Sequence, residues 1–216
     1  MIVDRKKKVF IAIPNLGTIV PSLAYNLIQW THDPRYTVQV FMPQNIFPQD
    51  AARNFCVKKF LESDCEYILW IDDDVFCPMD ALHRLVSHDK DMVGAAVFAM
   101  KYEGDEAFPY PVTLRFNEEK KYQVYYGSGL EEIDATGSAC LLIKRKVYEH
   151  PSIERPYIFS YHRDGTLSLT CDFDFNRRAK EAGFKLWADW GIVCSHVKEV
   201  DLKMLNNLLV RIKNGK

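Results

Sequence analysis

Three consecutive aspartates follow a run of apolar residues in the first half of the chain. The stretch LWIDDDVFCP places Asp72, Asp73 and Asp74 between that apolar run and Pro78. Two like charges about 4 Å apart repel by roughly 4 kcal/mol at an intermediate effective dielectric constant. We therefore expect a positively charged group to lie beside these carboxylates.

The spacing of the outer two aspartates suits a hard cation. If the chain stays extended after the apolar run, Asp72 and Asp74 point to the same side, because side chains alternate along a strand. Such a pair can hold Mg²⁺ or Mn²⁺ together with waters and substrate phosphates. The cation would then neutralise charge on a departing diphosphate. A structural alternative is that the aspartates cap the following helix and face water.

The composition is that of an ordinary globular chain. The 216 residues are 48% hydrophobic and 26% charged, and the formal net charge is -1. No overall basic field exists, so nucleic acid is not expected as the main partner. The apolar run near the N-terminus is too short for a signal-peptide core, which favours a cytoplasmic protein. The 6 cysteines form no CxxC pair and occupy apolar settings, so we expect reduced thiols in the core.

Apolar runs alternate with helical patterns through the first hundred residues. The runs that predict strands are 8–14, 37–42, 66–71 and 91–98. Helices are expected to begin near Pro21, Asp50 and Pro78. This alternation predicts a mostly parallel α/β sheet flanked by helices. Ligands of such sheets bind beyond the carboxyl ends of the strands, and the aspartates follow the third strand.

The second half of the chain is less regular. Residues 101–131 are rich in tyrosine and phenylalanine among prolines and glycines, which indicates an inserted loop or hairpin. The segments that follow predict a strand over 133–143, a hairpin turned at Asp164 and Gly165, a helix over 174–184, and short strands over 185–189 and 191–197. The last residues predict an amphipathic helix that packs on the domain or a partner, with attachment to a membrane surface as the alternative.

Four further segments accompany the aspartates in a fixed order. They are AARN at 51–54, TGSACLLIKRKVYE at 136–149, CDFDFNRRAKEAGFKLWAD at 171–189 and SHV at 195–197. Together with the aspartates they resemble GT-A fold glycosyltransferases, most closely those similar to family 2. The resemblance covers nearly the whole chain. It implies a single Rossmann-like α/β domain over 1–200 with a small antiparallel portion in its second half, followed by an amphipathic helix over 201–216.

The resemblance also implies a reaction and a metal. Its members move a sugar from a nucleoside diphosphate sugar, UDP-sugar by default, to a hydroxyl acceptor such as a glycan or a lipid-linked sugar. The outer aspartates would hold Mn²⁺ or Mg²⁺ and the donor, with Asp74 on the metal and diphosphate and Asp72 on the ribose. His196 matches a histidine that serves as a further metal ligand. The implied metal set is Asp72, Asp74 and His196, and Asp73 adds a donor contact from the variable middle position.

Asp172 matches the general base of inverting family members. A carboxylate can fill that role, because it need only accept a proton as the sugar carbon becomes electrophilic. Cys171 stands where relatives carry a glutamate, which departs from the family pattern. The structural alternative for Asp172 is a helix cap.

Other donor contacts follow from the same resemblance. Arg53 and Asn54 would lie beside the nucleotide and diphosphate, where a guanidinium suits phosphate; the alternative is a solvated arginine on a helix face. Relatives bind the nucleobase near Pro14 and Asn15.

The sugar pocket is expected along a later turn. Relatives line that pocket with residues that match Thr136 and Gly137, because glycine permits close approach of backbone and ligand. Asp134 could contact sugar hydroxyls or serve a structural purpose.

Two other functions stay open at this stage. One is a degenerate, non-catalytic module that binds a nucleotide sugar or glycan, and Cys171 is its best support. The other is a sugar nucleotidyltransferase, which uses a glycine-rich, basic loop after its first strand. The segment PNLGTIVP at 14–21 has one glycine and no basic residue, which counts against this second function.

Overall fold

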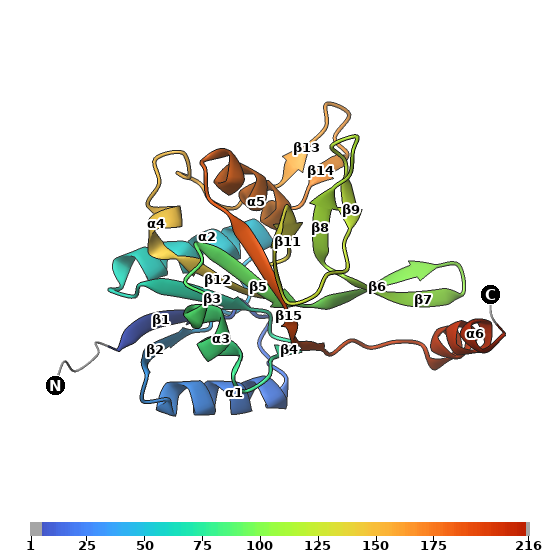
Figure 1. The fold of residues 1–216 in the computed structure, drawn as a ribbon, viewed down its shortest axis with the longest axis horizontal. Coiled ribbons are helices and arrows are strands. Elements are labelled where there is room, and N and C mark those ends of the chain that lie inside the picture. Colours follow the sequence, from blue (N-terminus) through green and yellow to red (C-terminus); the bar gives the residue numbers. More distant parts are fainter. Residues whose placement is uncertain (1–5, 215–216) are drawn as a thin grey trace.

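The computed structural model describes residues 6–214, and a seven-stranded sheet forms the centre of the molecule (Figure 1). Its strands, in spatial order, are β10 (Leu130–Ile133), β15 (Leu186–Val193), β5 (Met92–Ala96), β12 (Cys140–Lys144), β3 (Tyr67–Ile71), β1 (Lys7–Ala12) and β2 (Tyr36–Phe41). The strands β1, β2, β3, β5 and β15 run in one direction, and β12 and β10 run in the opposite one. The predicted mostly parallel sheet is confirmed, with β12 inserted antiparallel between β3 and β5.

Helices cover both faces of this sheet. On one face α1 (Pro21–His32) and α3 (Ala81–Ser87) contribute to an apolar cluster, and on the other α2 (Gln49–Glu62), α4 (Arg145–Tyr148) and α5 (Cys171–Glu181) contribute to a second one. All residues of β3 and β5 are buried. A strand covered on both faces needs apolar residues at every position, which explains its continuous apolar run.

Short antiparallel pairs extend from the second half of the chain. These pairs are β6 (Phe98–Glu103) with β7 (Glu106–Pro111), β8 (Thr113–Phe116) with β9 (Tyr122–Val124) and β11 (Ala135–Thr136), and β13 (Ser160–Tyr161) with β14 (Leu167–Leu169). A last pair, β4 (Val75–Phe76) with β16 (Ser195–His196), joins the segment after the aspartates to the end of the domain. The predicted hairpin at Asp164 and Gly165 is confirmed.

Several predicted boundaries were wrong. The helix expected at Pro78 is α3, which begins at Ala81, and Pro78 accepts a backbone hydrogen bond in the turn before it. The helix expected at Asp50 begins at Gln49, so Asp50 lies in its first turn. The helix expected over 174–184 begins at Cys171, which places Asp172 inside the helix and not at its cap. The strands expected over 185–189 and 191–197 are one irregular strand, β15, and the short β16.

The C-terminal helix α6 (Leu202–Lys213) lies beside the outer part of the hairpin of β6 and β7 (Figure 1). Arg211 pairs with Glu106 of β7 at 2.7 Å, and Asn207 donates to the carbonyl of Asp105. No residue of α6 is buried. Within residues 6–214, no helix combines the length and apolar character that crossing a bilayer requires.

Candidate functional site

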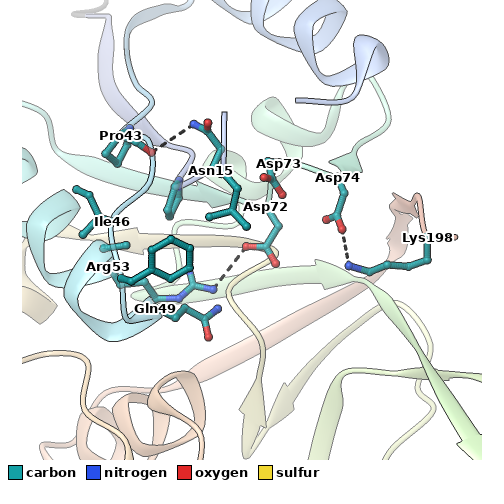
Figure 2. Close-up of a pocket in the computed structure, with 13 residues that line it drawn as sticks. Asn15, Pro43, Ile46, Gln49, Arg53, Asp72, Asp73, Asp74 and Lys198 are labelled. Carbon is teal, nitrogen blue, oxygen red and sulfur yellow. Dashed lines mark hydrogen bonds and ion pairs between the residues drawn. The ribbon is translucent and has the colours of Figure 1, made fainter. Parts of the chain in front are cut away.

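The aspartates form a turn and do not extend β3. The strand ends at Ile71, and the backbone N–H of Val75 donates to the carbonyl oxygen of Asp72 at 3.1 Å. The extended chain on which the expectation of a one-sided pair depended is absent, but Asp72 and Asp74 line the same cavity. Figure 2 shows Asp72 directed toward Arg53 and Asp74 directed toward Lys198.

Arg53 of α2 is a buried positive charge between two carboxylates. Its Nε lies 2.9 Å from Oδ1 of Asp172, and its Nη2 lies 3.5 Å from Oδ1 of Asp72. The rings of Trp70 and Tyr157 lie 5.3 and 5.8 Å from the guanidinium carbon. Burial opposes the charge, but Asp172 and Asp72 outweigh that effect and raise the pKa of Arg53 above its usual range. The alternative of a solvated arginine is thereby excluded.

Asp172 is held by more than this ion pair. The hydroxyl of Ser138 donates to Oδ1 of Asp172 at 2.9 Å. The carboxylate lies in the first turn of α5, where the partial positive charge of a helix N-terminus favours an anion. The side chain of Asp172 is 14% exposed, so a ligand can still reach it. Ser138 was missed by the sequence analysis, although it belongs to the TGSAC segment that was recognised.

Asp74 lies in a second group of charges, which the pairing of β4 with β16 creates. Nδ1 of His196 donates to the carbonyl oxygen of Phe98 at 2.7 Å, and its Nε2 lies 3.1 Å from Oδ1 of Asp74. The ammonium of Lys198 pairs with Oδ2 of Asp74. Burial opposes ionisation of Asp74, but His196 and Lys198 outweigh it and lower the pKa of Asp74 to about 2.

This second group fits a divalent cation. The hydrogen bond from Nδ1 to Phe98 turns Nε2 toward Asp74, and the contact with Asp74 raises the pKa of His196. A cation that displaces the Nε2 proton would find this nitrogen already oriented, as in many metal-ligating histidines. Nε2 is buried and lacks a well-aligned hydrogen-bond partner among the described residues. Of the expected metal set, the structure thus brings Asp74 and His196 together, whereas Asp72 pairs with Arg53.

A cavity of about 290 Å³ lies beside the aspartate turn. Its walls are Pro14, Asn15, Leu16, Pro43, Ile46, Phe47, Gln49, Ala52, Arg53, Asp72, Asp73, Asp74 and Lys198 (Figure 2). The amide of Asn15 donates to the carbonyls of Ile13 and Pro43 and accepts from the backbone N–H of Gly17. Asn15 therefore shapes the wall by joining the ends of β1 and β2.

The outer wall of this cavity was missed by the sequence analysis. Ile46 and Phe47 come from the segment between β2 and α2, and Gln49 is the first residue of α2. Phe47 is 69% exposed, which is unusual for a phenylalanine. This exposure marks Phe47 as a candidate binding residue, and it is known only from the folded chain. Asp73 also lines the cavity, and burial raises its pKa.

Three expected donor contacts lie away from this cavity. The amide of Asn54 donates to the carbonyl of Tyr157 at 2.7 Å and accepts from its N–H at 3.0 Å. Arg53 lines the cavity, whereas Asn54, its neighbour in α2, does not. The hydroxyl of Thr136 donates to the carbonyl of Val112, and a Cβ on Gly137 would lie 3.1 Å from Val112. These residues have structural roles here.

Two other uncertain positions also have structural settings. Asp134 accepts a hydrogen bond from the backbone N–H of Phe116 and pairs with Lys180. Cys171 is fully buried in the second apolar cluster, and burial raises the pKa of its thiol to about 12. The position where relatives carry a glutamate thus faces the core beside Arg53, whereas Asp172 keeps some exposure to solvent.

Comparison with known proteins identifies the family. The sequence profile described as glycosyl transferase family 2 matches residues 34–150, which is more than half of the chain. The chain belongs to glycosyl transferase family 2. It is therefore a glycosyltransferase, and its sheet and small antiparallel pairs are those of the GT-A fold. No curated protein matches the chain.

Solved structures similar to this glycosyltransferase share its fold at low identity. A197 from STIV is 17% identical with a TM-score of 0.52, and the match covers 89% of this chain and 86% of A197. GalNAc-T7 with UDP, GalNAc and Mn²⁺ is 10% identical with a TM-score of 0.57, covering 92% of this chain and 45% of that one. TarS 1-349 from S. aureus with UDP-GlcNAc is 12% identical with a TM-score of 0.51, covering 91% and 60%.

Proposed function

We propose that this glycosyltransferase moves a sugar from a UDP-sugar to a hydroxyl acceptor, with inversion at the sugar carbon and with a divalent cation. The observation that carries the proposal is the meeting of two charged groups at the carboxyl end of β3. Arg53, Asp72 and Asp172 form one group, and Asp74 with His196 forms the other. Sheets of this kind bind ligands at this edge.

The cavity beside the aspartates would take the nucleotide. Its apolar side contains Pro14, Pro43, Ile46 and Phe47, which suit the faces of a base, and its charged side contains the aspartate turn and Lys198. The ammonium of Lys198 can turn from Asp74 to a phosphate oxygen. UDP or a UDP-sugar is present in the GalNAc-T7 and TarS structures, which supports uridine as the first nucleotide to test.

Asp74 and His196 would hold Mn²⁺ or Mg²⁺. When bound, such a cation neutralises charge on the departing diphosphate. The carbonyl of Phe98 keeps Nε2 of His196 turned toward Asp74, so the two ligand atoms are already oriented. Asp72, which pairs with Arg53 and lines the same cavity, would contact the donor.

Asp172 would act as the general base. It would accept the proton of the acceptor hydroxyl while the acceptor oxygen bonds to the anomeric carbon and the bond from that carbon to the diphosphate breaks. Ser138 and Arg53 both contact the carboxylate of Asp172, so its orientation is fixed.

The test is release of UDP from a panel of UDP-sugars by the full chain, with Mn²⁺ and after chelation. We expect metal-dependent turnover that Asp74→Ala and Asp172→Ala each reduce by at least about 100-fold, equal to about 2.7 kcal/mol in the barrier. Asp164→Ala, in the exposed hairpin turn, is the matched control and should retain activity. Undiminished turnover in both variants would overturn the mechanism, and donor binding without any UDP release would favour a binding module.

A further inference from the structure

Three cysteines from distant parts of the chain meet in the core. Sγ of Cys77 lies 3.4 Å from Sγ of Cys140, and Sγ of Cys194 lies 3.3 Å from Sγ of Cys77. All three sulfur atoms lie within 4.8 Å of one another. The chain's cysteines are all free thiols, so this group, the thiol triad, is not tied by a disulfide.

The thiol triad is buried, and hydrogen bonds hold the backbone of two of its residues. Cys77, Cys140 and Cys194 are 1%, 2% and 4% exposed, and they belong to the apolar cluster beneath α1 and α3. The amide of Asn26, itself fully buried, accepts from the N–H of Cys77 and donates to its carbonyl. The N–H of Cys194 donates to the carbonyl of Ala96. The three thiols are therefore held in a defined arrangement.

This arrangement has the donor atoms and spacing of a three-coordinate soft-metal site. With metal–sulfur bonds of about 2.3 Å, sulfurs at the corners of a trigonal plane are about 4.0 Å apart. The separations of Cys77 from Cys140 and from Cys194, 3.4 and 3.3 Å, are within about 0.7 Å of that spacing. Soft thiolate ligands select Cu(I) and Zn²⁺.

The number of ligands favours Cu(I) over the alternatives. Structural zinc is almost always four-coordinate, and iron–sulfur clusters are held by four cysteines. No fourth histidine, cysteine, aspartate or glutamate joins the triad among residues 6–214.

We propose that the thiol triad is a binding site for a soft, thiophilic metal ion that accepts three sulfur ligands, with Cu(I) as the ion that fits best. The ligands sit on the segments that build the cleft: Cys77 follows β4, Cys140 begins β12 just after Ser138, and Cys194 precedes β16. An ion bound there would tie these segments together behind Asp74 and His196. The site does not depend on the proposed sugar transfer.

The test is an anaerobic competition of the full chain against a chromogenic Cu(I) chelator. We expect one Cu(I) per chain, a sulfur-only shell of three atoms by X-ray absorption, and a rise in Tm of about 5–10 °C at Cu(I) well above the Kd. Zn²⁺ should bind more weakly and raise Tm less. Tighter binding of Zn²⁺, or a copper shell with fewer than three sulfurs, would overturn the assignment.

Variants separate the triad from other thiols. Cys140→Ala should weaken Cu(I) binding more than about tenfold, because losing a ligand costs at least as much as losing an outer-shell partner. Cys56→Ala, at an equally buried free thiol of the other apolar cluster, is the matched control and should bind as the native chain does. Cys194→Ser tests the same point if Cys140→Ala does not fold. Native binding by both triad variants, or no binding by the native chain, would refute the proposal.

Discussion

The two sides of the aspartate turn are built differently. On one side Arg53 is 1% exposed and is enclosed by Asp72, Asp172 and aromatic rings. On the other side the side chain of Lys198 is 45% exposed where it pairs with Asp74. Asp72 thus pairs with a buried cation, and Asp74 pairs with a half-exposed one.

The difference indicates that the two sides of the turn have different roles. Removing one partner of a buried ion pair is strongly destabilising, because the remaining charge stays buried without compensation. A solvent-exposed ion pair contributes only about 0–1 kcal/mol, so its partners can separate at little cost. We infer that the Arg53 side fixes the geometry of the cleft, whereas the Asp74 side can exchange Lys198 for a ligand.

The largest effect is expected when the buried charge of Arg53 is removed. Arg53→Ala should lower the free energy of unfolding by about 3–5 kcal/mol, since Asp72 and Asp172 lose their buried partner. Urea denaturation measures the change. Lys198→Ala is the matched control on the open side and should cost at most about 1 kcal/mol. Equal losses in the two variants would contradict this difference in roles.

The reverse pattern is expected for Asp74→Asn. It should reduce metal-dependent turnover by roughly 100-fold, because a metal ligand is lost. Its effect on the free energy of unfolding should be smaller than that of Arg53→Ala, because one partner of Asp74 is half-exposed and Asn can still accept a hydrogen bond from His196. UDP release and urea denaturation on the same preparation give both values, and a large loss of stability would show that Asp74 belongs to the rigid side.

A smaller effect is expected for Ser138→Ala. The variant removes one hydrogen bond to Asp172 but leaves the ion pair with Arg53. A hydrogen bond to a charged group is worth about 1.5–3 kcal/mol, so kcat should fall by at least about tenfold. The KM for the donor should change little, because Ser138 does not line the nucleotide cavity. Steady-state kinetics would contradict this role if KM rose and kcat did not fall.

The smallest effect is expected for Lys198→Met. The variant removes the ammonium that competes with a cation for Asp74. Without donor present, Mn²⁺ should bind up to about fivefold more tightly, which corresponds to the weight of an exposed ion pair. Titration calorimetry of the variant and the native chain with Mn²⁺, in the absence of donor, measures this affinity. Weaker Mn²⁺ binding in this variant would mean that Lys198 stabilises the metal site and does not compete with the cation for Asp74.

Residue patterns predicted much of the fold but fewer of the residues that form the candidate site. Continuous apolar runs predicted β1, β3 and β5, because strands covered on both faces carry apolar residues throughout. The same patterns could not distinguish Arg53 from Asn54, since their directions depend on where α2 begins and how it packs. The cavity wall of Ile46 and Phe47 lies in a connecting segment without periodicity, so no local rule could find it.

The sequence by itself determined the alternating elements, the place of the aspartates after β3 and the family segments, because these depend on neighbours along the chain. Only the tertiary structure decided that Asp72 pairs with Arg53 while Asp74 pairs with Lys198. It also decided that Arg53 meets Asp172, and that Cys77 meets Cys194, across separations of 119 and 117 residues. Contacts over such distances follow from the strand order of the sheet, which no local pattern of residues specifies.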